Sequence, residues 1–285
     1  MTSYAPWVGG PFIWRLGLRP LDLADWIELG EEYAADLAVK ATVRREHPDT
    51  VFVTLPEALD ACREVLDVLV EHLVSTWPEH FERRGETVHN VLTGGDVPLD
   101  GSIHPLDAAS QLVQEDLVVM IEIGGELVFG AGSVCFPNRW DLRSKLGLPL
   151  RAVHQPVSLL NDQLGETIDR FFDRLTPERS FWRLGWGVLD SVDLYQPLDG
   201  TAAPRPATPT PADLVVRVER ETLRRLPRTG CVLFTIRTHL AKATELAADP
   251  RHGPVIAEAL AAMPPTVRQY KQVDRVAAAL AELFV

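Results

Sequence analysis

The sequence has few cysteines and no long apolar run. Only three of its 285 residues are cysteine, at positions 62, 135 and 231. None belongs to a CxxC pair, which excludes a zinc ribbon, a thioredoxin motif and a covalent CxxCH haem site. An odd, scattered set of cysteines is typical of a reducing compartment. No stretch approaches the roughly 20 apolar residues that span a bilayer, and residues 1–15 do not resemble a signal peptide. We therefore expect a cytoplasmic protein without a membrane partner.

Positive charge is also scarce. The chain has 28 Lys and Arg against 40 Asp and Glu, a net charge of −12 at pH 7, and a pI near 5.1. A nucleic-acid partner would need a basic surface, so the composition excludes that class. The acidic balance fits a cationic ligand or a basic protein partner, and equally a plain acidic surface.

Motifs of other cofactors and catalysts are missing. The segment 130–135 begins like GxGxxG, but it lacks the third glycine and continues a predicted strand instead of opening a helix. There is no Walker A loop, and Ser133 lacks the context of a nucleophile elbow. No histidine pair has zincin spacing, and no carboxylate–histidine cluster indicates non-haem iron. With no flavin or nicotinamide motif, a redox enzyme of this sequence would take electrons from a separate reductase.

The apolar pattern predicts an α+β protein. Helices are expected at 22–29, 31–45, from Pro56 onward, and at 108–114, 140–146, 167–175 and, interrupted by prolines, 241–285. Strands are expected at 117–123, 126–136, 181–189, 214–222 and 231–239, with a loop at 90–105. Helices flanking antiparallel strands favour α+β over a doubly wound parallel sheet. We expect one domain, 1–285, with the Pro-rich segment 200–211 as a surface loop inserted in it.

One histidine stands in an apolar segment, Val153-His154-Gln155-Pro156-Val157. Neutral imidazole is the commonest axial donor to haem iron, and such a donor needs an apolar pocket. His154 is therefore the first candidate iron ligand, and His104, next to Pro105, is the second. From the residues alone, a satisfied core histidine explains His154 as well.

Three segments together carry a family resemblance: 133–140 (SVCFPNRW), 153–157 (VHQPV) and 217–230 (RVERETLRRLPRTG). They resemble the alpha subunit of haem-dependent oxidative N-demethylases, over roughly residues 11–240. The resemblance implies a haem b domain with a PAS-like antiparallel sheet wrapped by helices, and His154 as ligand of the iron. It further implies oxygen-dependent N-demethylation of a small alkylamine with release of formaldehyde. The electrons would come from a separate flavin or iron–sulfur reductase.

Four arginines are candidates for binding the haem propionates, because guanidinium binds carboxylates in a fork. They are Arg217, Arg220, Arg224 and Arg237. Period two places Arg217 and Arg220 on opposite faces of the expected strand. Surface ion pairs with neighbouring carboxylates explain these arginines equally well.

Two carboxylates are candidate catalytic residues, since a carboxylate near the iron would hold a cationic amine and take its proton. They are Glu219 and Asp116, with Glu115 as a further choice, and solvated strand-end charges are the alternative. Phe136 and Trp140 are candidate walls of the haem pocket, or ordinary core aromatics. The resemblance leads us to expect asparagine at the position of Gly185. With glycine there, one polar contact would be missing, and the substrate could differ from that of the founding enzyme of the family.

Two other functions stay open. One is a non-catalytic haem-binding gas sensor or carrier, and the other is a haem-free interaction module with His154 in its core. A polar pocket beside a carboxylate would favour the enzyme. Absence of a haem-sized cavity would favour the module.

Overall fold

The computed structural model describes residues 4–9, 15–155, 157 and 160–284. Its centre is a seven-stranded antiparallel sheet in the order β1-β8-β9-β10-β6-β7-β2, accompanied by a small sheet, β3-β4-β5. The strands of the large sheet are β1 Arg19–Pro20, β2 Phe52–Thr54, β6 Asp116–Ile123, β7 Glu126–Ser133, β8 Phe181–Leu189, β9 Val215–Arg225 and β10 Val232–Lys242. The small sheet consists of β3 Phe81–Arg84, β4 Thr87–Asn90 and β5 Gly95–Pro98.

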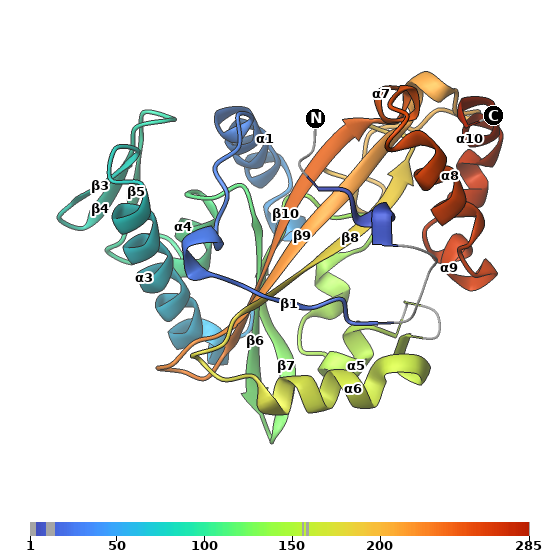
Figure 1. The fold of residues 1–285 in the computed structure, drawn as a ribbon. Coiled ribbons are helices and arrows are strands. Elements are labelled where there is room, and N and C mark those ends of the chain that lie inside the picture. The colour runs from blue at the N-terminus through green and yellow to red at the C-terminus, as the bar shows by residue number, and fades with distance from the viewer. Residues whose placement is uncertain (1–3, 10–14, 156, 158–159, 285) are drawn as a thin grey trace.

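Helices cover both faces of the large sheet (Figure 1). The α-helices are α1 Tyr33–Glu46, α2 Pro48–Val51, α3 Leu59–Thr76, α4 Pro105–Ser110, α5 Leu150–Val153, α6 Leu160–Arg174, α7 Ala243–Ala248, α8 Gly253–Ala261, α9 Pro265–Tyr270 and α10 Ala277–Leu283. The 3-10 helices are η1 Pro6–Gly9, η2 Leu23–Asp25, η3 Pro56–Ala58, η4 Leu142–Lys145, η5 Pro211–Asp213 and η6 Val273–Val276.

The two faces of the sheet have separate cores, because successive side chains of a strand point to opposite sides. On one face, Leu117 and Leu233 pack with buried residues of α3 such as Leu69. On the other, Val118 and Phe234 pack with side chains of α5 and α6. We call these the α3 face and the α6 face. Each strand of the centre therefore contributes to two different environments.

The C-terminal helices form a third cluster at one end of β8 and β9. Val216 and Val218 pack with Leu246 and Ile256, and with Trp7 from the N-terminal arm. These helices surround the upper right end of the strands in Figure 1. The predicted helical tail is thus confirmed, with breaks near its prolines.

Most long predicted elements are confirmed. The strand 181–189 has the predicted bounds, the hairpin of 117–123 with 126–136 is β6–β7, and 214–222 pairs with 231–239 as β9–β10. The predicted loop 90–105 is wrong in part, because it contains β5. The helix expected at 22–29 is only the 3-10 turn η2, and that at 140–146 is only η4. The segment 200–210 has no helix or strand, as expected of a loop.

The antiparallel α+β fold class is thereby confirmed. No helix in the described parts of the chain is long and apolar enough to cross a bilayer.

Candidate functional site

His154 lies directly after α5, on the α6 face of the sheet. Its Nδ1 is buried without a hydrogen-bond partner, and the ring donates or accepts no hydrogen bond with any described residue. Burial lowers the pKa of His154 to about 4, with contributions from the charges of Arg183 and Lys145. The imidazole is therefore neutral near pH 7, which is the form that binds iron. Pro156 of the same motif lies outside the described residues.

Apolar side chains surround the segment that precedes His154. Leu150 and Val153 of α5 and Phe171 of α6 pack against the cluster formed by Val118, Met120, Phe129 and other residues of the α6 face. Trp140, one of the predicted pocket walls, belongs to the same group. An apolar surrounding of this kind suits a haem ring.

Strands β8 and β9 add charged groups to this face. In their register, Arg183 lies opposite Glu221 and Gly185 lies opposite Glu219. Nε of Arg183 is 2.5 Å from Oε2 of Glu221, and Nε of Arg217 is 2.9 Å from Oε1 of Glu219. Burial raises the pKa of Glu221; Arg183 opposes this shift and the charge of Glu219 adds to it. Each carboxylate thus uses one oxygen in an ion pair.

The second oxygens of both carboxylates converge above Gly185. A Cβ placed on Gly185 would lie 3.2 Å from Oε1 of Glu221 and 3.6 Å from Oε2 of Glu219. These two oxygens accept no hydrogen bond from the described residues. The charge of the half-buried Lys271, whose Nζ donates to the carbonyl oxygen of Trp186 at 2.5 Å, acts on both carboxylates. Two carboxylate oxygens facing one point are also suited to hold the two N–H groups of a secondary ammonium.

Unfilled space continues beside Gly185 at Gly187, which is itself buried. It lies two residues further along β8, on the same face, and a Cβ placed on it meets no atom within 4 Å. The strand therefore presents bare backbone at two successive positions of the α6 face. Glycine in a strand interior commonly marks close approach of a ligand or another backbone.

Three of the four predicted propionate arginines lie on the α3 face, away from His154. Nη1 of Arg220 donates to the carbonyl oxygen of Trp26 at 3.0 Å, and Nη2 donates to that of Asp25. The guanidinium of Arg224 stacks 4.0 Å from the ring centroid of Trp26. Because the sheet separates these groups from His154, they cannot reach a haem bound to it.

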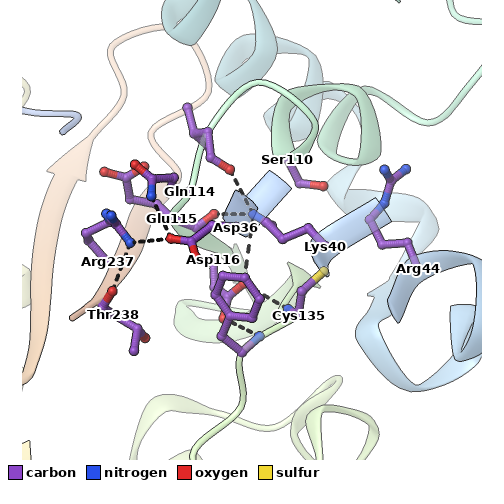
Figure 2. Close-up of polar contacts among 12 residues, drawn as sticks. Asp36, Lys40, Arg44, Ser110, Gln114, Glu115, Asp116, Cys135, Arg237 and Thr238 are labelled. Atoms are coloured by element: carbon purple, nitrogen blue, oxygen red, sulfur yellow. Dashed lines mark hydrogen bonds and ion pairs between the residues drawn. The ribbon is translucent and has the colours of Figure 1, made fainter. Parts of the chain in front are cut away.

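Arg237 belongs to a buried network of charges on the α3 face (Figure 2). Its Nη1 donates to Oδ2 of Asp36 at 3.1 Å and to the carbonyl oxygen of Thr238 at 2.8 Å. Gln114 donates to the same Asp36 oxygen at 2.6 Å. These contacts hold α1 against the sheet and leave Arg237 distant from His154.

Asp116 has a structural position at the end of the same network. Its carboxylate accepts hydrogen bonds from the backbone N–H groups of Cys135 and Phe136 at 2.8 and 2.9 Å. Nζ of Lys40 is 3.9 Å from Oδ1, and it donates to the carbonyl oxygens of Val113 and Glu115 as well (Figure 2). Both oxygens of Asp116 are therefore engaged within the protein.

The remaining predicted residues also have partners of their own. Oε1 of Glu115 accepts from the backbone N–H of Glu28 at 3.1 Å. Phe136 packs with Val43, in a small cluster separate from that of His154. Nδ1 of His104 accepts from the N–H of Leu106 at 3.2 Å and caps α4.

Arg217 is the predicted arginine that lies on the α6 face. Besides Glu219, its guanidinium donates to the carbonyl oxygen of Phe136 and to Oγ1 of Thr238. The side chain is 1% exposed, so it anchors Glu219 and has little surface left for a propionate.

The sequence analysis missed three residues of this site: Arg183, Lys145 and Glu221. The charges of Arg183 and Lys145 reach His154, and Glu221 supplies one of the converging oxygens. The alternation of side chains along the strand 181–189 places Arg183 and Gly185 on one face, and the sequence alone could have predicted this. The packing of α5 over that face depends on tertiary contacts and was not.

The comparison with protein families gives one match along almost the whole chain. A family model described as haem-dependent oxidative N-demethylase, alpha subunit-like, matches residues 17–281. The chain belongs to this family.

Proposed function

We propose that this protein binds haem b and catalyses oxygen-dependent oxidative N-demethylation of a small alkylamine. The family name supports the haem and the reaction class. The observation that carries the proposal is the pairing of a neutral, unpartnered histidine with two convergent carboxylate oxygens on one face of the sheet.

In this proposal His154 holds the haem iron. Its buried Nδ1 has no competing partner, its ring is neutral, and its neighbours are apolar. Arg183 and Lys145 replace the four sequence-predicted arginines as partners of the propionates, because they are the cations whose charge reaches His154. The antiparallel sheet wrapped by helices would then serve as a PAS-like haem domain, with residues 1–285 forming one unit.

Glu219 and Glu221 would hold the substrate. The bare backbone of Gly185 leaves room for an ammonium group between Oε2 of Glu219 and Oε1 of Glu221. Of the two, Glu219 is the proposed proton acceptor, as the sequence analysis expected, because its side chain is 20% exposed and can pass the proton on to solvent, whereas that of Glu221 is 11% exposed. Asp116 is not part of this proposal, since both of its oxygens are engaged.

The bound haem would supply oxygen activation, leaving a demethylated amine and formaldehyde as products. The residues of this chain position the amine, hold its proton at Glu219 and keep the ring environment apolar. Electrons have to come from elsewhere, and the name of the family describes an alpha subunit. We therefore propose a separate flavin or iron–sulfur reductase as partner.

Absorption spectroscopy of the haemin-reconstituted protein tests the ligand. We expect a Soret band that weakens or shifts in His154→Ala and is unchanged in His104→Ala. His89→Ala, in the small sheet, is the matched surface control. A band that changes only in His104→Ala would move the ligand there.

Two further outcomes distinguish the alternative functions. A Soret band without amine turnover in the presence of reductant and oxygen would favour a gas sensor or carrier. No band after reconstitution would leave a haem-free interaction module. The convergent carboxylates favour the enzyme over the gas sensor, because gas binding does not need them. They do not separate the enzyme from the haem-free module, because the linings of the two described cavities do not include His154 and both carboxylates have ion-pair partners.

A further inference from the structure

A small cavity lies beyond the end of β8, where three arginines surround one carboxylate. Nε of Arg275 is 2.6 Å from Oδ2 of Asp190, Nη1 of Arg205 is 3.6 Å from Oδ1, and Nη2 of Arg139 donates to Oδ1. The side chain of Asp190 has no exposed surface. Three positive charges thus share one buried negative charge.

Two of these arginines line the cavity itself. Its volume is about 50 Å³, and its walls include Arg139, Arg205, Tyr195 and Gln196. A space of this size holds more than one water, since one water needs roughly 10–15 Å³. It suits one small oxyanion or the terminal group of a larger molecule. One carboxylate, Asp193, also lines it, but that residue is exposed and accepts a hydrogen bond from Oγ of Ser191.

Two residues that line the cavity each have one buried polar side-chain atom without a partner. Nε of Arg139 is buried without a partner, in a side chain that is 8% exposed. Oε1 of Gln196 is likewise buried without a partner, while its Nε2 donates to the carbonyl oxygen of Asp193. Leaving buried polar atoms unsatisfied is costly, so these two atoms indicate a ligand that both accepts and donates.

The surrounding structure holds Arg139 in this position. Arg139 and Gln272 are the two non-glycine residues with positive φ in the described chain, at 59° and 53°. Nη1 of Arg139 donates to Oε1 of Gln272 at 3.0 Å, and Arg205 donates to the same oxygen at 3.2 Å. Burial lowers the pKa of Arg139, Asp190 opposes this shift, and Arg205 adds to it, so an anion would relieve the repulsion.

We propose that this cavity binds a phosphate group, with Arg139 and Arg205 as the cationic ligands. A phosphate oxygen would accept from Nε of Arg139. A P–OH group would donate to Oε1 of Gln196. Free phosphate has such a group near neutral pH and sulfate has none, while a phosphate monoester has one only in its monoanionic form, since its second pKa is about 6. Free phosphate and a phosphate monoester both carry this phosphate group, so both are candidate ligands of the cavity.

The proposed phosphate site is separate from the amine site. Gly185, over which the oxygens of the amine site converge, and Asp190 are five residues apart along β8 and its end. At about 3.3 Å per residue this is roughly 17 Å. The inference therefore does not rest on the proposed haem function.

Calorimetric titration of the full-length protein at constant ionic strength tests this site. We expect saturable binding of inorganic phosphate, weaker binding of sulfate, and about tenfold weaker phosphate binding in Arg205→Gln, which loses one charge-assisted hydrogen bond. Arg251→Gln is the control, because that side chain is 76% exposed, pairs with Asp249 and is not among the residues that line the cavity. Arg205 lies in the loop 200–211, so its replacement leaves the core intact.

The ligands used in the titration separate the sources of the phosphate group. Binding of methyl phosphate as well as inorganic phosphate would indicate a monoester ligand, and binding of inorganic phosphate alone would indicate the free ion. Equal affinity for sulfate and phosphate, or no saturable binding of either, would overturn the assignment. So would an equal loss of affinity in Arg205→Gln and Arg251→Gln.

Discussion

Arg183 and Glu221 lie directly opposite each other on β8 and β9, with Nε of Arg183 2.5 Å from Oε2 of Glu221. This pair connects the two halves of the candidate site. The charge of Arg183 acts on His154, and Glu221 supplies one of the two free oxygens above Gly185. Both halves of the site therefore respond to one guanidinium.

Replacing that guanidinium should shift two pKa values in the same direction. In Arg183→Gln the pKa of His154 should rise, since the positive charge that opposes its protonation is gone. The pKa of Glu221 should also rise, because its carboxylate loses the cation that favours ionisation. NMR titration of the histidine and carboxylate side chains measures both.

Arg179→Gln is the control for Arg183, because Arg179 contacts Phe181 near the start of the same strand. It should leave both pKa values in place. A fall of the His154 pKa in Arg183→Gln would contradict the electrostatic link.

The depressed pKa of His154 also predicts how stability depends on pH. The unfolded chain binds a proton at His154 near pH 6.5, whereas the folded protein does so only near pH 4. The resulting stabilisation is complete above pH 6.5 and is lost as pH falls toward 4. A difference of this size corresponds to about 3 kcal/mol.

Urea unfolding of the wild type and His154→Gln at pH 7 and pH 4.5 measures this contribution. The wild type should lose more stability than the variant over this range, by up to about 3 kcal/mol. Comparison with the variant is needed because His72 has a pKa near 4 as well and adds its own loss. Equal losses in both proteins would rule out the buried neutral state of His154.

The predictability of this fold from sequence varies with the kind of contact. Alternation within 214–222 correctly separated Arg217 and Glu219 from Arg220, because period two is a local property of a strand. It could not say which face meets His154, since that depends on how α5 packs across β7. The strands β3, β4 and β5 are four residues each, too short for a periodic pattern.

The candidate site shows the same division between local and tertiary information. Asp116 was expected to be catalytic because it begins a core strand. What determines its role is the approach of the Cys135 and Phe136 N–H groups, about twenty positions later in the chain. Likewise, no pattern in the Pro-rich loop predicts that Arg205 contacts Asp190, because that contact depends on how the loop packs against the end of β8.

The two sequence-predicted carboxylates should therefore behave differently on mutation. Asp116→Asn replaces an acceptor of two backbone N–H groups and removes the partner of Lys40, so we expect a loss of about 1–3 kcal/mol in stability. The Soret band of the reconstituted protein should stay in place. Glu219→Gln should lower amine turnover of the folded, haem-bound protein by about 10²–10⁴, as removal of a general base does. It should lower stability as well, because the buried Arg217 loses its paired carboxylate.

Thermal unfolding, the Soret band and turnover with reductant are measured for both variants. Glu126→Gln, at the exposed end of the β6–β7 hairpin, is the matched control and should change none of them. Loss of turnover in a stable, haem-replete Asp116→Asn protein would restore Asp116 as a catalytic residue.

The bare backbone at Gly185 gives the sharpest test of the amine site. In Gly185→Ala the new methyl group would lie 3.2 Å from Oε1 of Glu221 and 3.6 Å from Oε2 of Glu219, in the space assigned to the ammonium. Gly187→Ala adds the same methyl group on the same face, where it meets no atom within 4 Å. Gly187→Ala should gain about 0.5–1 kcal/mol from the reduced flexibility of the unfolded chain, whereas in Gly185→Ala the 3.2 Å contact with Oε1 of Glu221 opposes this gain.

Amine binding to the reconstituted proteins separates the two positions. Gly185→Ala should raise KM for the amine and retain the Soret band, because the methyl group obstructs the carboxylate oxygens and leaves His154 untouched. Gly187→Ala should leave KM near the wild-type value; a weaker Soret band in this variant would place the haem over β8. If both alanines left KM unchanged, the amine would bind elsewhere, and the convergent oxygens of Glu219 and Glu221 would be no more than ends of ion pairs.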